Sequence, residues 1–230
     1  MSSTADLKPI KHYGQVAPNP VKTLVFLIEL NLPYEIVHVP FSDVRKPDYI
    51  AINPNGRLPA IHDPNTDLTL WESGAITEYL MEHYDKDHKL SFPQGSKEAY
   101  LAKQWLAFQI SGQGPYYGQF VWFSKYHSEK LPSAIERYSN EVKRVTGVLE
   151  KQLEKQKEIY GATEGFDGPW ILGNKMSFVD LAFVPWQGFM AKQLSGYDEA
   201  EFPLVTEWLN KMMARESVQK VLALQSQVQE

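Results

Sequence analysis

Glu72 and Ser73 are two neighbouring polar residues at a point where the chain changes its structure. They stand inside LTLWESGAITEYL, residues 68–80, which reads as a short apolar strand followed directly by an amphipathic helix. A serine at a helix start can satisfy free backbone N–H groups, and an acidic residue there complements the positive end of the helix dipole. The same pair can instead hold a ligand. From these residues alone both interpretations, a helix cap and a ligand-binding site, stay open.

Cysteine chemistry is excluded, because the chain of 230 residues contains no cysteine. Disulfide bonds, thiolate metal sites and a cysteine nucleophile are therefore absent, and any thiol chemistry must use a thiol that arrives as a ligand. His83 and His88 lie near acidic residues, a composition that resembles a metal site, but they straddle the end of a predicted helix and a polar segment. A solvated surface cluster is the better interpretation, and we expect no metal ion.

The composition is that of an ordinary globular protein, with 43% hydrophobic and 22% charged residues. A net charge of −5 and the lack of a basic tract argue against nucleic acid or an anionic membrane as the main partner. No apolar run approaches the ~18 residues that a membrane span needs, since TLVFLIELNL is interrupted by Glu29. The N-terminal segment has no apolar signal core, which predicts a cytoplasmic location.

Short elements of alternating type fill residues 1–85 and must position Glu72 and Ser73. Their order is β-α-β-α-β-β-α, which predicts a compact mixed sheet with helices on its faces. The residues PNT between the last two strands are typical of a hairpin turn. The predicted strands are Ile10–Tyr13, Glu35–Val39, Leu58–His62 and Leu68–Trp71, and the predicted helices are Pro18–Leu30, Lys46–Asn53 and Ala75–Tyr84.

Residues 86–95 are polar and rich in turn residues, and we interpret them as a linker to a second domain, residues 96–230. No strand pattern follows, so this domain is predicted to be all-helical. Pro115, in GQGP, must kink or break the first of its helices. In GNKMSFVDLAF, Ser177 and Asp180 form a capping box, which marks a helix start rather than a catalytic site. The predicted helices are Lys97–His127, Ser133–Tyr160, Ser177–Lys192, Pro203–Ala214 and Ser217–Leu224.

The order of these elements, together with NPNGRLPAI, WESGAI and SFVDLAF, resembles the cytosolic glutathione transferases over nearly the whole chain. Stretches such as PNPVKTLVFLIELNLPY, WLAFQISGQGPYYGQ and AIERYSNEVKRVTGVLE are similar to the fungal nitrogen-catabolite regulator with a transferase body and to the bacterial nu-class enzymes. WESGAI alone is weak evidence, but several stretches in the same order are specific. The resemblance implies a thioredoxin-like N-terminal domain, an all-helical C-terminal domain, a homodimer, and glutathione as the ligand that brings the thiol.

The resemblance assigns Glu72 and Ser73 to the γ-glutamyl end of glutathione, which carries an α-carboxylate and an α-ammonium on one carbon. Ser73 and the N–H groups of its helix start offer donors to the carboxylate, and Glu72 offers the opposite charge to the ammonium. The family also has a cis-proline at the position of Pro59. A cis bond there leaves the backbone of Leu58 free to pair with the cysteinyl amide of glutathione, like one rung of an added strand.

Basic side chains are candidates for the carboxylates of glutathione. Arg57 is the first candidate for the glycyl carboxylate, although a solvated surface cation explains it equally, and Arg45 and Lys46 are weaker candidates. The fungal regulator has a histidine where this chain has Val44, so that contact is absent here. Arg144 matches an arginine that related enzymes send across the dimer towards glutathione, and the alternative interpretation is an exposed helix charge.

Activation of the thiol falls to Asn19, which stands in the PN motif of the nu-like branch. A cysteine thiol has a pKa near 8.5, and lowering that pKa by about two units takes roughly 2.7 kcal/mol of preferential thiolate stabilisation. The side-chain N–H of Asn19 and the field of the helix N-terminus can both contribute. Asparagine is also a preferred N-cap. Bacterial relatives have a threonine where this chain has Ala17, so a second donor is missing, and Tyr13 is a lower-ranked alternative.

An aromatic-rich stretch after residue 113 supplies candidates for an electrophile pocket. Part of such a cluster belongs to a core or a dimer interface. The rest, with a neighbouring glutamine, is expected to form an apolar wall that faces the sulfur. The pocket candidates are Gln113, Tyr116, Tyr117 and Phe120.

The predicted function is that of a glutathione transferase, which stabilises the glutathione thiolate and transfers or adds it to a small organic electrophile. Disulfide reduction and double-bond isomerisation in a biosynthetic pathway start from the same thiolate, so the glutathione site does not separate them from conjugation. A non-enzymatic regulator built on the transferase fold is an alternative of a different class. The fungal regulator carries a long Asn-rich leader, whereas this chain starts shortly before its first predicted strand. We therefore expect an enzyme.

Overall fold

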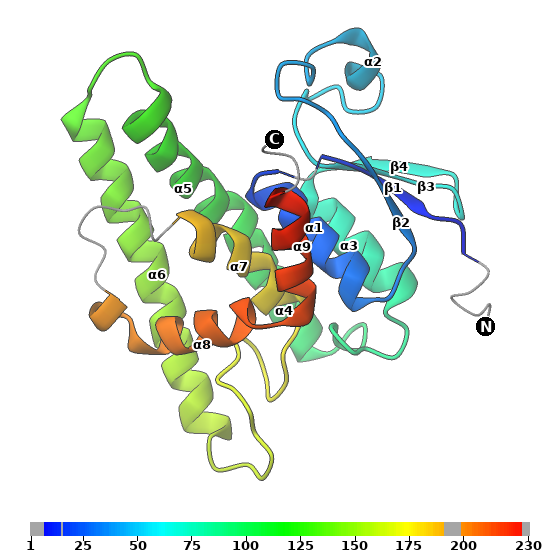
Figure 1. Cartoon of the computed structure of the whole chain (residues 1–230). Helices are drawn as coiled ribbons and strands as arrows, with labels where there is room; N and C mark the ends of the chain where they lie inside the picture. Colours follow the sequence, from blue (N-terminus) through cyan, green and yellow to red (C-terminus); the bar gives the residue numbers. More distant parts are fainter. Residues whose placement is uncertain (1–6, 15, 191–198, 227–230) are drawn as a thin grey trace. The chain divides into compact units, whose positions relative to one another are not determined.

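The computed structural model describes residues 7–14, 16–190 and 199–226 of the chain. The chain forms two compact units. The first comprises the residues up to Asp87 together with those from Arg215 onward, and the second comprises His88–Ala214. The first unit has a thioredoxin-like fold and the second is helical (Figure 1), as the sequence predicts.

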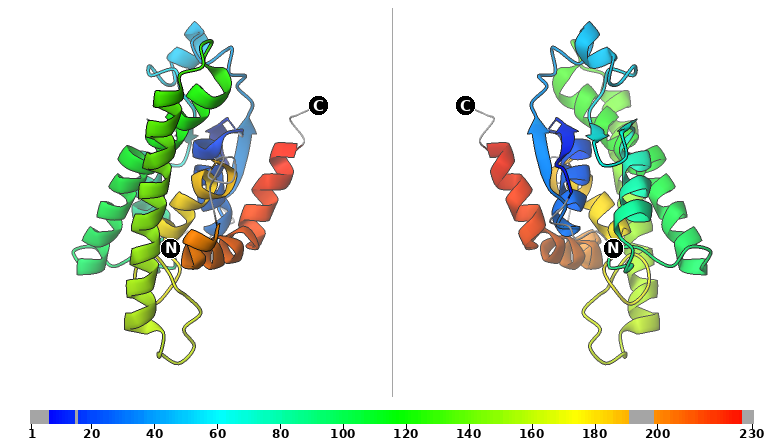
Figure 2. Two further views of the ribbon diagram at one scale, coloured as in Figure 1. Left: turned by 90° about the vertical axis from the view of Figure 1, so that its left-hand side faces the viewer. Right: turned by 90° about the vertical axis from the view of Figure 1, so that its right-hand side faces the viewer.

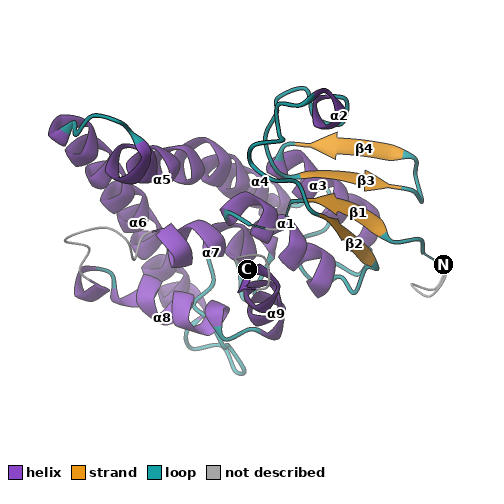
Figure 3. Ribbon diagram, turned by 45° about the horizontal axis from the view of Figure 1, so that its top comes forward, coloured by secondary structure: helices purple, strands orange, loops and turns teal. Residues whose placement is uncertain are grey.

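The first unit is built on a four-stranded mixed sheet (Figure 3), whose strands follow the order β2-β1-β3-β4. β1 pairs with β2 in parallel, and the pairs β1–β3 and β3–β4 are antiparallel. Each strand is short, and its neighbours in the chain are helices or tight turns. The strands are β1 (Ile10–Tyr13), β2 (Tyr34–Val37), β3 (Ala60–Asp63) and β4 (Leu68–Trp71), and the helices are α1 (Pro18–Glu29), α2 (Pro47–Ile50) and α3 (Ser73–Tyr84).

α1 is the central helix of this unit. Pro18 stands at its first position, where the missing N–H costs no hydrogen bond, and the residues that follow are buried almost without interruption up to Leu27. α1 packs against α3. A helix that is buried nearly all round must be covered on several sides, which explains the apolar run TLVFLI.

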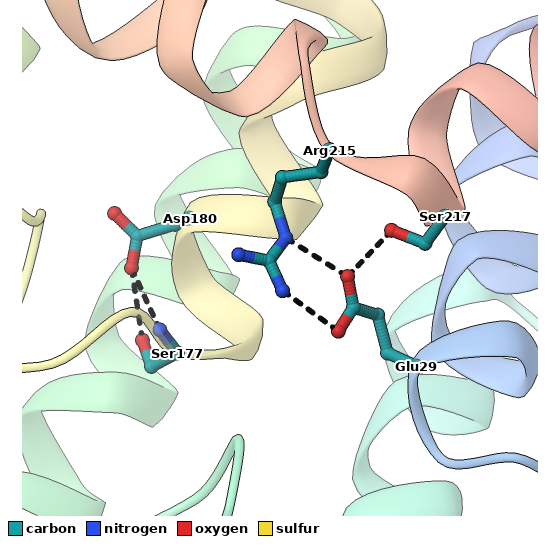
Figure 4. A network of polar contacts seen from close by, with 5 residues as sticks. All are labelled: Glu29, Ser177, Asp180, Arg215 and Ser217. Carbon is teal, nitrogen blue, oxygen red and sulfur yellow. Dashed lines mark hydrogen bonds and ion pairs between the residues drawn. The ribbon is translucent and has the colours of Figure 1, made fainter.

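The C-terminal helix α9 (Glu216–Ser226) belongs to the first unit and packs against α1. Figure 1 shows α9 in red beside the blue α1. Arg215 donates two hydrogen bonds to the carboxylate of Glu29, each 2.9 Å long, and the Ser217 hydroxyl donates a third (Figure 4). The sequence-based division places all of residues 96–230 in the second domain, whereas the structure groups those from Arg215 onward with the first unit.

Removal of the arginine should weaken this attachment. The Glu29 side chain is only 12% exposed, so Arg215→Ala leaves a largely buried carboxylate without its bidentate partner. We expect the free energy of unfolding to fall by about 2 kcal/mol, measured by urea unfolding. Lys157→Ala is the control, because its ion pair with Glu207 spans 3.8 Å between exposed side chains and should contribute less than about 0.5 kcal/mol. Equal losses in both variants would contradict the anchoring role.

The second unit contains no strand within the described residues 88–190 and 199–214. Figure 2 shows its long helix α6 running beside α5. The predicted helix 177–192 begins as expected, but its predicted end at Lys192 lies outside the described residues. The α-helices are α4 (Lys97–Phe108), α5 (Gly114–Val121), α6 (Pro132–Tyr160), α7 (Phe178–Met190) and α8 (Pro203–Met213). The π-helical segments are η2 (Gln109–Gln113) and η3 (Trp122–Tyr126), and η5 (Glu199–Glu201) is a 3₁₀ helix.

Pro115 is accommodated by a π-helical turn. Residues 109–113 have i→i+5 geometry and lead directly into α5, where Pro115 occupies the first turn. A wider turn before a proline removes the clash between its ring and the preceding carbonyl. The predicted helix over 97–127 therefore continues as a series of α- and π-helical segments and does not break.

The capping box at the start of α7 is confirmed. Ser177 Oγ accepts from the backbone N–H of Val179 at 3.3 Å, and the Asp180 carboxylate accepts from the Ser177 backbone N–H at 3.0 Å (Figure 4). Asp180 also accepts from the Ile171 N–H at 2.9 Å and from the Trp208 indole at 3.0 Å. One buried carboxylate thus joins the loop before α7, the start of α7 and α8.

None of the described helices combines the length and the apolar character that crossing a membrane requires.

Candidate functional site

Three segments meet at one end of the sheet in the first unit. Tyr13 pairs with Ala60, and Ala60 pairs with Trp71. The residues that follow Tyr13, precede Ala60 and follow Trp71 must therefore lie at the same end. These segments lead into α1, contain Leu58–Pro59 and contain Glu72–Ser73. We call this group, Asn19, Leu58, Pro59, Glu72 and Ser73, the sheet-end site.

The Leu58–Pro59 peptide bond is cis, as the resemblance implies. The loop before it is fixed through the Arg57 carbonyl, which accepts hydrogen bonds from Tyr49 Oη at 2.8 Å and from Asn53 Nδ2 at 2.6 Å. Burial raises the pKa of Tyr49 to about 12, so the phenol remains a donor at neutral pH. The segment before Pro59 is therefore held in one conformation.

The backbone groups of Leu58 make no hydrogen bond to any other described residue. The Leu58 side chain lies against Gly14, where an added Cβ would come within 2.9 Å of a Leu58 methyl group. Gly14 also has a φ of +91°, a conformation that other residues rarely adopt. Leu58 thus has a fixed side chain and a backbone that is able to pair with an extended peptide.

The start of α3 carries Glu72 and Ser73. Glu72 is the N-cap residue, with a φ of +67°, and its side chain makes no capping hydrogen bond. Its carboxylate instead accepts from Asn55 Nδ2 at 3.2 Å. Ser73 is the first residue of the helix and is buried. Glu72 thus stands at the cap position without a side-chain capping hydrogen bond, and the first N–H groups of α3 remain available to an anion.

Asn19 lies in the first turn of α1, but it is not the N-cap. Ala17 holds that position with a φ of +86°, and its carbonyl accepts from the Val21 N–H at 3.2 Å. The Asn19 carbonyl accepts from Thr23 Oγ1 at 3.5 Å. Ala17 is therefore the N-cap residue of α1, and the interpretation of Asn19 as an N-cap is wrong.

The basic candidates near this site differ in their partners. Arg57 is exposed and has no ion pair among the described residues. Lys46 pairs with Asp43 at 2.7 Å, and this contact lowers the pKa of Asp43. Arg45 is also exposed and has no ion pair among the described residues. Of these candidates, Arg57 and Arg45 are therefore the two cations without an ion pair to a described residue, whereas Lys46 is paired.

Tyr13, the alternative activator, is half-buried at the end of β1. Its ring lies 6.2 Å from that of Tyr49. Burial, aided by the charge of Glu35, raises the pKa of its hydroxyl. The raised pKa makes Tyr13 a weaker acid than an ordinary tyrosine.

Two buried titratable residues of α1 and β1 are functional candidates that the sequence analysis missed. Lys22 has no exposed surface, and burial lowers its pKa to about 7 against the opposing effect of Glu72. His12 is equally buried, and burial lowers its pKa to about 4. Its Nε2 lies 2.6 Å from Thr23 Oγ1, and that hydroxyl oxygen lies 3.1 Å from the Pro20 carbonyl oxygen. A lysine inside the apolar run of α1 is the signal that could have identified Lys22.

The pocket candidates of the second unit divide by burial. Gln113 and Tyr117 have no exposed surface. Gln113 Nε2 donates to the Phe183 carbonyl and to Gln187 Oε1, both at 3.2 Å, and Tyr117 Oη donates to Gln187 Oε1 at 2.9 Å. These two residues belong to a closed polar network inside the unit, which corrects their placement on a pocket wall.

The other two pocket candidates, Tyr116 and Phe120, differ in burial. Phe120 is 6% exposed and belongs to the core between α5 and α6, whereas Tyr116 is partly buried at its edge. Arg144 lies 6.0 Å from the Tyr116 ring and pairs with Glu141 at 2.9 Å. Tyr116 and Arg144 are therefore the candidate residues of this unit that a ligand can still reach.

Among the described residues, no group of three or more histidine, aspartate or glutamate side chains is arranged to hold a metal ion. His83 packs against the rings of Tyr79 and Tyr84 at 5.5 and 4.7 Å. His88 Nδ1 lies 3.0 Å from Ser91 Oγ. Both histidines thus have structural neighbours.

Comparison with known families matches both parts of the chain. Residues 8–82 match the glutathione S-transferase N-terminal domain, and residues 115–216 match the glutathione S-transferase C-terminal domain. The chain is 58% identical over 221 residues to the glutathione S-transferase-like protein tpcF of Aspergillus fumigatus, with 95% of this chain and 96% of that protein covered.

Two further proteins connect the chain to a branch of that family. It is 36% identical over 231 residues to the protein URE2 of Saccharomyces bayanus, covering 90% of this chain and 67% of that protein. The crystal structure of the glutathione transferase URE2P8 from Phanerochaete chrysosporium, determined with oxidized glutathione, superposes with a TM-score of 0.88 at 36% identity. The superposition covers 96% of this chain and 97% of that one.

Proposed function

Because this chain belongs to the glutathione S-transferase family, we propose that it binds glutathione at the sheet-end site, stabilises the thiolate and transfers or adds it to a small organic electrophile. The observation that carries the proposal is the backbone of Leu58. It lacks a partner among the described residues and lies beside a cis-proline, at the same end of the sheet as the start of α3. A peptide with charged ends fits this arrangement.

Each part of glutathione has a partner in this proposal. The cysteinyl amide pairs with the Leu58 backbone, as a strand pairs with a sheet edge. The γ-glutamyl carboxylate accepts from Ser73 and from the first N–H groups of α3, and the neighbouring ammonium contacts Glu72. Arg57 takes the glycyl carboxylate, and Asn19 donates to the sulfur.

We further propose that the enzyme is a cytoplasmic homodimer, with Arg144 reaching the glutathione of the partner subunit. Tyr116 then contributes to the electrophile pocket. Sedimentation at micromolar concentration should show a dimer, because an obligate interface persists at such concentrations.

The expected binding defect of Glu72→Gln tests this glutathione site. The substitution removes the charge that meets the ammonium and keeps the side-chain shape, so the dissociation constant for glutathione should rise about tenfold to thirtyfold, measured by calorimetry. Glu98→Gln is the matched control, since Glu98 is an exposed acid in the first turn of α4, and its affinity should stay within twofold of the unmodified protein. Equal affinity in both variants would place the γ-glutamyl group elsewhere.

The reaction type is tested with a panel of four electrophiles: a chloronitrobenzene, hydroxyethyl disulfide, a peroxide and an activated alkene. Conjugation, disulfide reduction and isomerisation all use the thiolate, and only turnover of these substrates separates them. Inactivity towards the whole panel by a protein that binds glutathione would contradict a general transferase and favour a dedicated biosynthetic enzyme.

The similarity to the nitrogen regulation fragment of the yeast prion protein Ure2p supports a second candidate function, that of a regulator. This candidate predicts a stable protein partner in pull-down experiments together with no turnover in the panel. Turnover with any of the four electrophiles would favour the enzyme.

A further inference from the structure

Lys22 is a fully buried lysine near the sheet-end site. It lies in α1 between Val21 and Thr23, which are also buried, and it is among the largest side chains without exposed surface. Lysines are almost never buried to this degree unless a partner compensates the charge. Its place in the unit therefore needs an explanation beyond packing.

Glu72 is the anion whose charge acts on this lysine. Burial lowers the pKa of Lys22 to about 7, and Glu72 opposes that change because a nearby carboxylate favours the ammonium form. The other charged residues that α1 and α9 bring together are engaged with each other, since Arg215 forms a bidentate pair with Glu29. His12, on the adjacent strand, is kept neutral by burial.

Lys22 and Glu72 differ in their exposure to solvent. Lys22 is buried within α1, whereas Glu72 is exposed at the N-cap of α3, where Asn55 holds its carboxylate. α1 and α3 pack against each other. Lys22 also follows Asn19 by three residues, which places both on one side of α1. Lys22 is thus buried in the helix that packs against α3, and Glu72 is exposed at the start of α3.

We propose that Lys22 is a positioning residue for the γ-glutamyl group of glutathione, which holds the Glu72 carboxylate in place and adds a positive field for the ligand's α-carboxylate. This inference rests on the proposed function. Glu72 and Lys22 together present one negative and one positive charge to a ligand group that carries one of each on a single carbon. Charges fixed in this way before binding need no reorganisation when the ligand arrives.

Lys22→Met separates this role from a structural one. Methionine keeps the length and volume of the side chain and removes the charge, and because Glu72 is exposed, the substitution leaves no buried carboxylate without its partner. We expect thermal stability to be unchanged or raised, while the dissociation constant for S-methylglutathione rises about tenfold. S-methylglutathione is the probe because its sulfur is blocked, so thiol ionisation does not affect the result.

Two further variants complete the design. Lys22→Arg keeps the charge and should bind S-methylglutathione within about threefold of the unmodified protein. Lys11→Met, on an exposed position of β1, removes an unrelated cation and should leave the affinity unchanged. In the Glu72→Gln background, Lys22→Met should raise the dissociation constant by less than it does in the unmodified protein, because only the field of Lys22 on the ligand's α-carboxylate remains to be lost.

Each result is decisive for one of the two proposals. Failure of the unmodified protein to bind S-methylglutathione would overturn the proposed function itself. Binding by the unmodified protein with equal affinity in Lys22→Met would overturn only the role of Lys22. A large loss of stability in Lys22→Met, together with unchanged affinity of Lys22→Arg and full additivity with Glu72→Gln, would show that Lys22 acts only through the fold.

Discussion

Replacement of Asp180 by alanine is expected to lower the free energy of unfolding of the second unit by about 3–5 kcal/mol. The Asp180 carboxylate is fully buried and accepts from the backbone N–H groups of Ile171 and Ser177, from Ser177 Oγ and from the Trp208 indole. Alanine leaves all four donors without an acceptor in an interior that water does not reach. Urea unfolding followed by tryptophan fluorescence measures the loss, because Trp208 lies in the network.

Asp167 provides a matched control in the same unit. It also accepts from a tryptophan indole, Trp170 Nε1, at 3.1 Å, but its side chain is 70% exposed. Asp167→Ala should therefore cost less than about 1 kcal/mol, because water replaces the lost acceptor. A similar loss in both variants would contradict the view that burial of Asp180 makes its hydrogen bonds important.

The pH dependence of the same residue gives a second measurement. Burial raises the pKa of Asp180 to about 6, above the value of 3.8 for an unperturbed aspartate. A raised pKa in the folded state means that protonation favours folding, so this contribution is fully present below pH 3.8 and is lost as the pH rises through 6. Relative to the non-titrating Asp180→Asn variant, the unmodified protein should gain up to about 3 kcal/mol on acidification through this window.

Asn19→Ala is expected to cut turnover at neutral pH about tenfold to a hundredfold. A hydrogen bond to a charged acceptor contributes roughly 1.5–3 kcal/mol. If the Asn19 amide donates to the sulfur of bound glutathione, its removal raises the pKa of that thiol and lowers the thiolate fraction. Affinity for glutathione should change little, because Leu58, Glu72 and Ser73 hold the rest of the peptide. Thiolate absorbance titrated against pH measures the pKa directly.

Glu72→Gln is the reciprocal comparison for this experiment. It should weaken glutathione binding and leave the pKa of the bound thiol nearly unchanged, because Glu72 meets the other end of the ligand. A titration curve that is the same in Asn19→Ala as in the unmodified protein would place the activator of the thiol elsewhere, with Tyr13 as the next residue to replace.

Local chemistry in the sequence determined the order of elements in both units. Alternating short segments indicated the mixed sheet, and residues such as Pro18, Ser177 and Asp180 marked helix starts through interactions that span only a few positions. The cis geometry of Leu58–Pro59 followed from a motif match and not from the residue pair, since most X–Pro bonds are trans. Signals that act within one turn or one hairpin are readable because neighbouring residues in the sequence are also neighbours in space.

Contacts between distant residues were decided only by the tertiary structure. The sequence placed Gln113 and Tyr117 on a pocket wall, but Gln187, from α7, closes them into a buried network. Periodicity also gave no means of assigning α9 to the first unit, because Arg215 and Glu29 meet across 186 positions of the chain. Lys22 is the third case. Whether a lysine in an amphipathic pattern faces water or another helix depends on what packs over it, and that is a property of the folded chain.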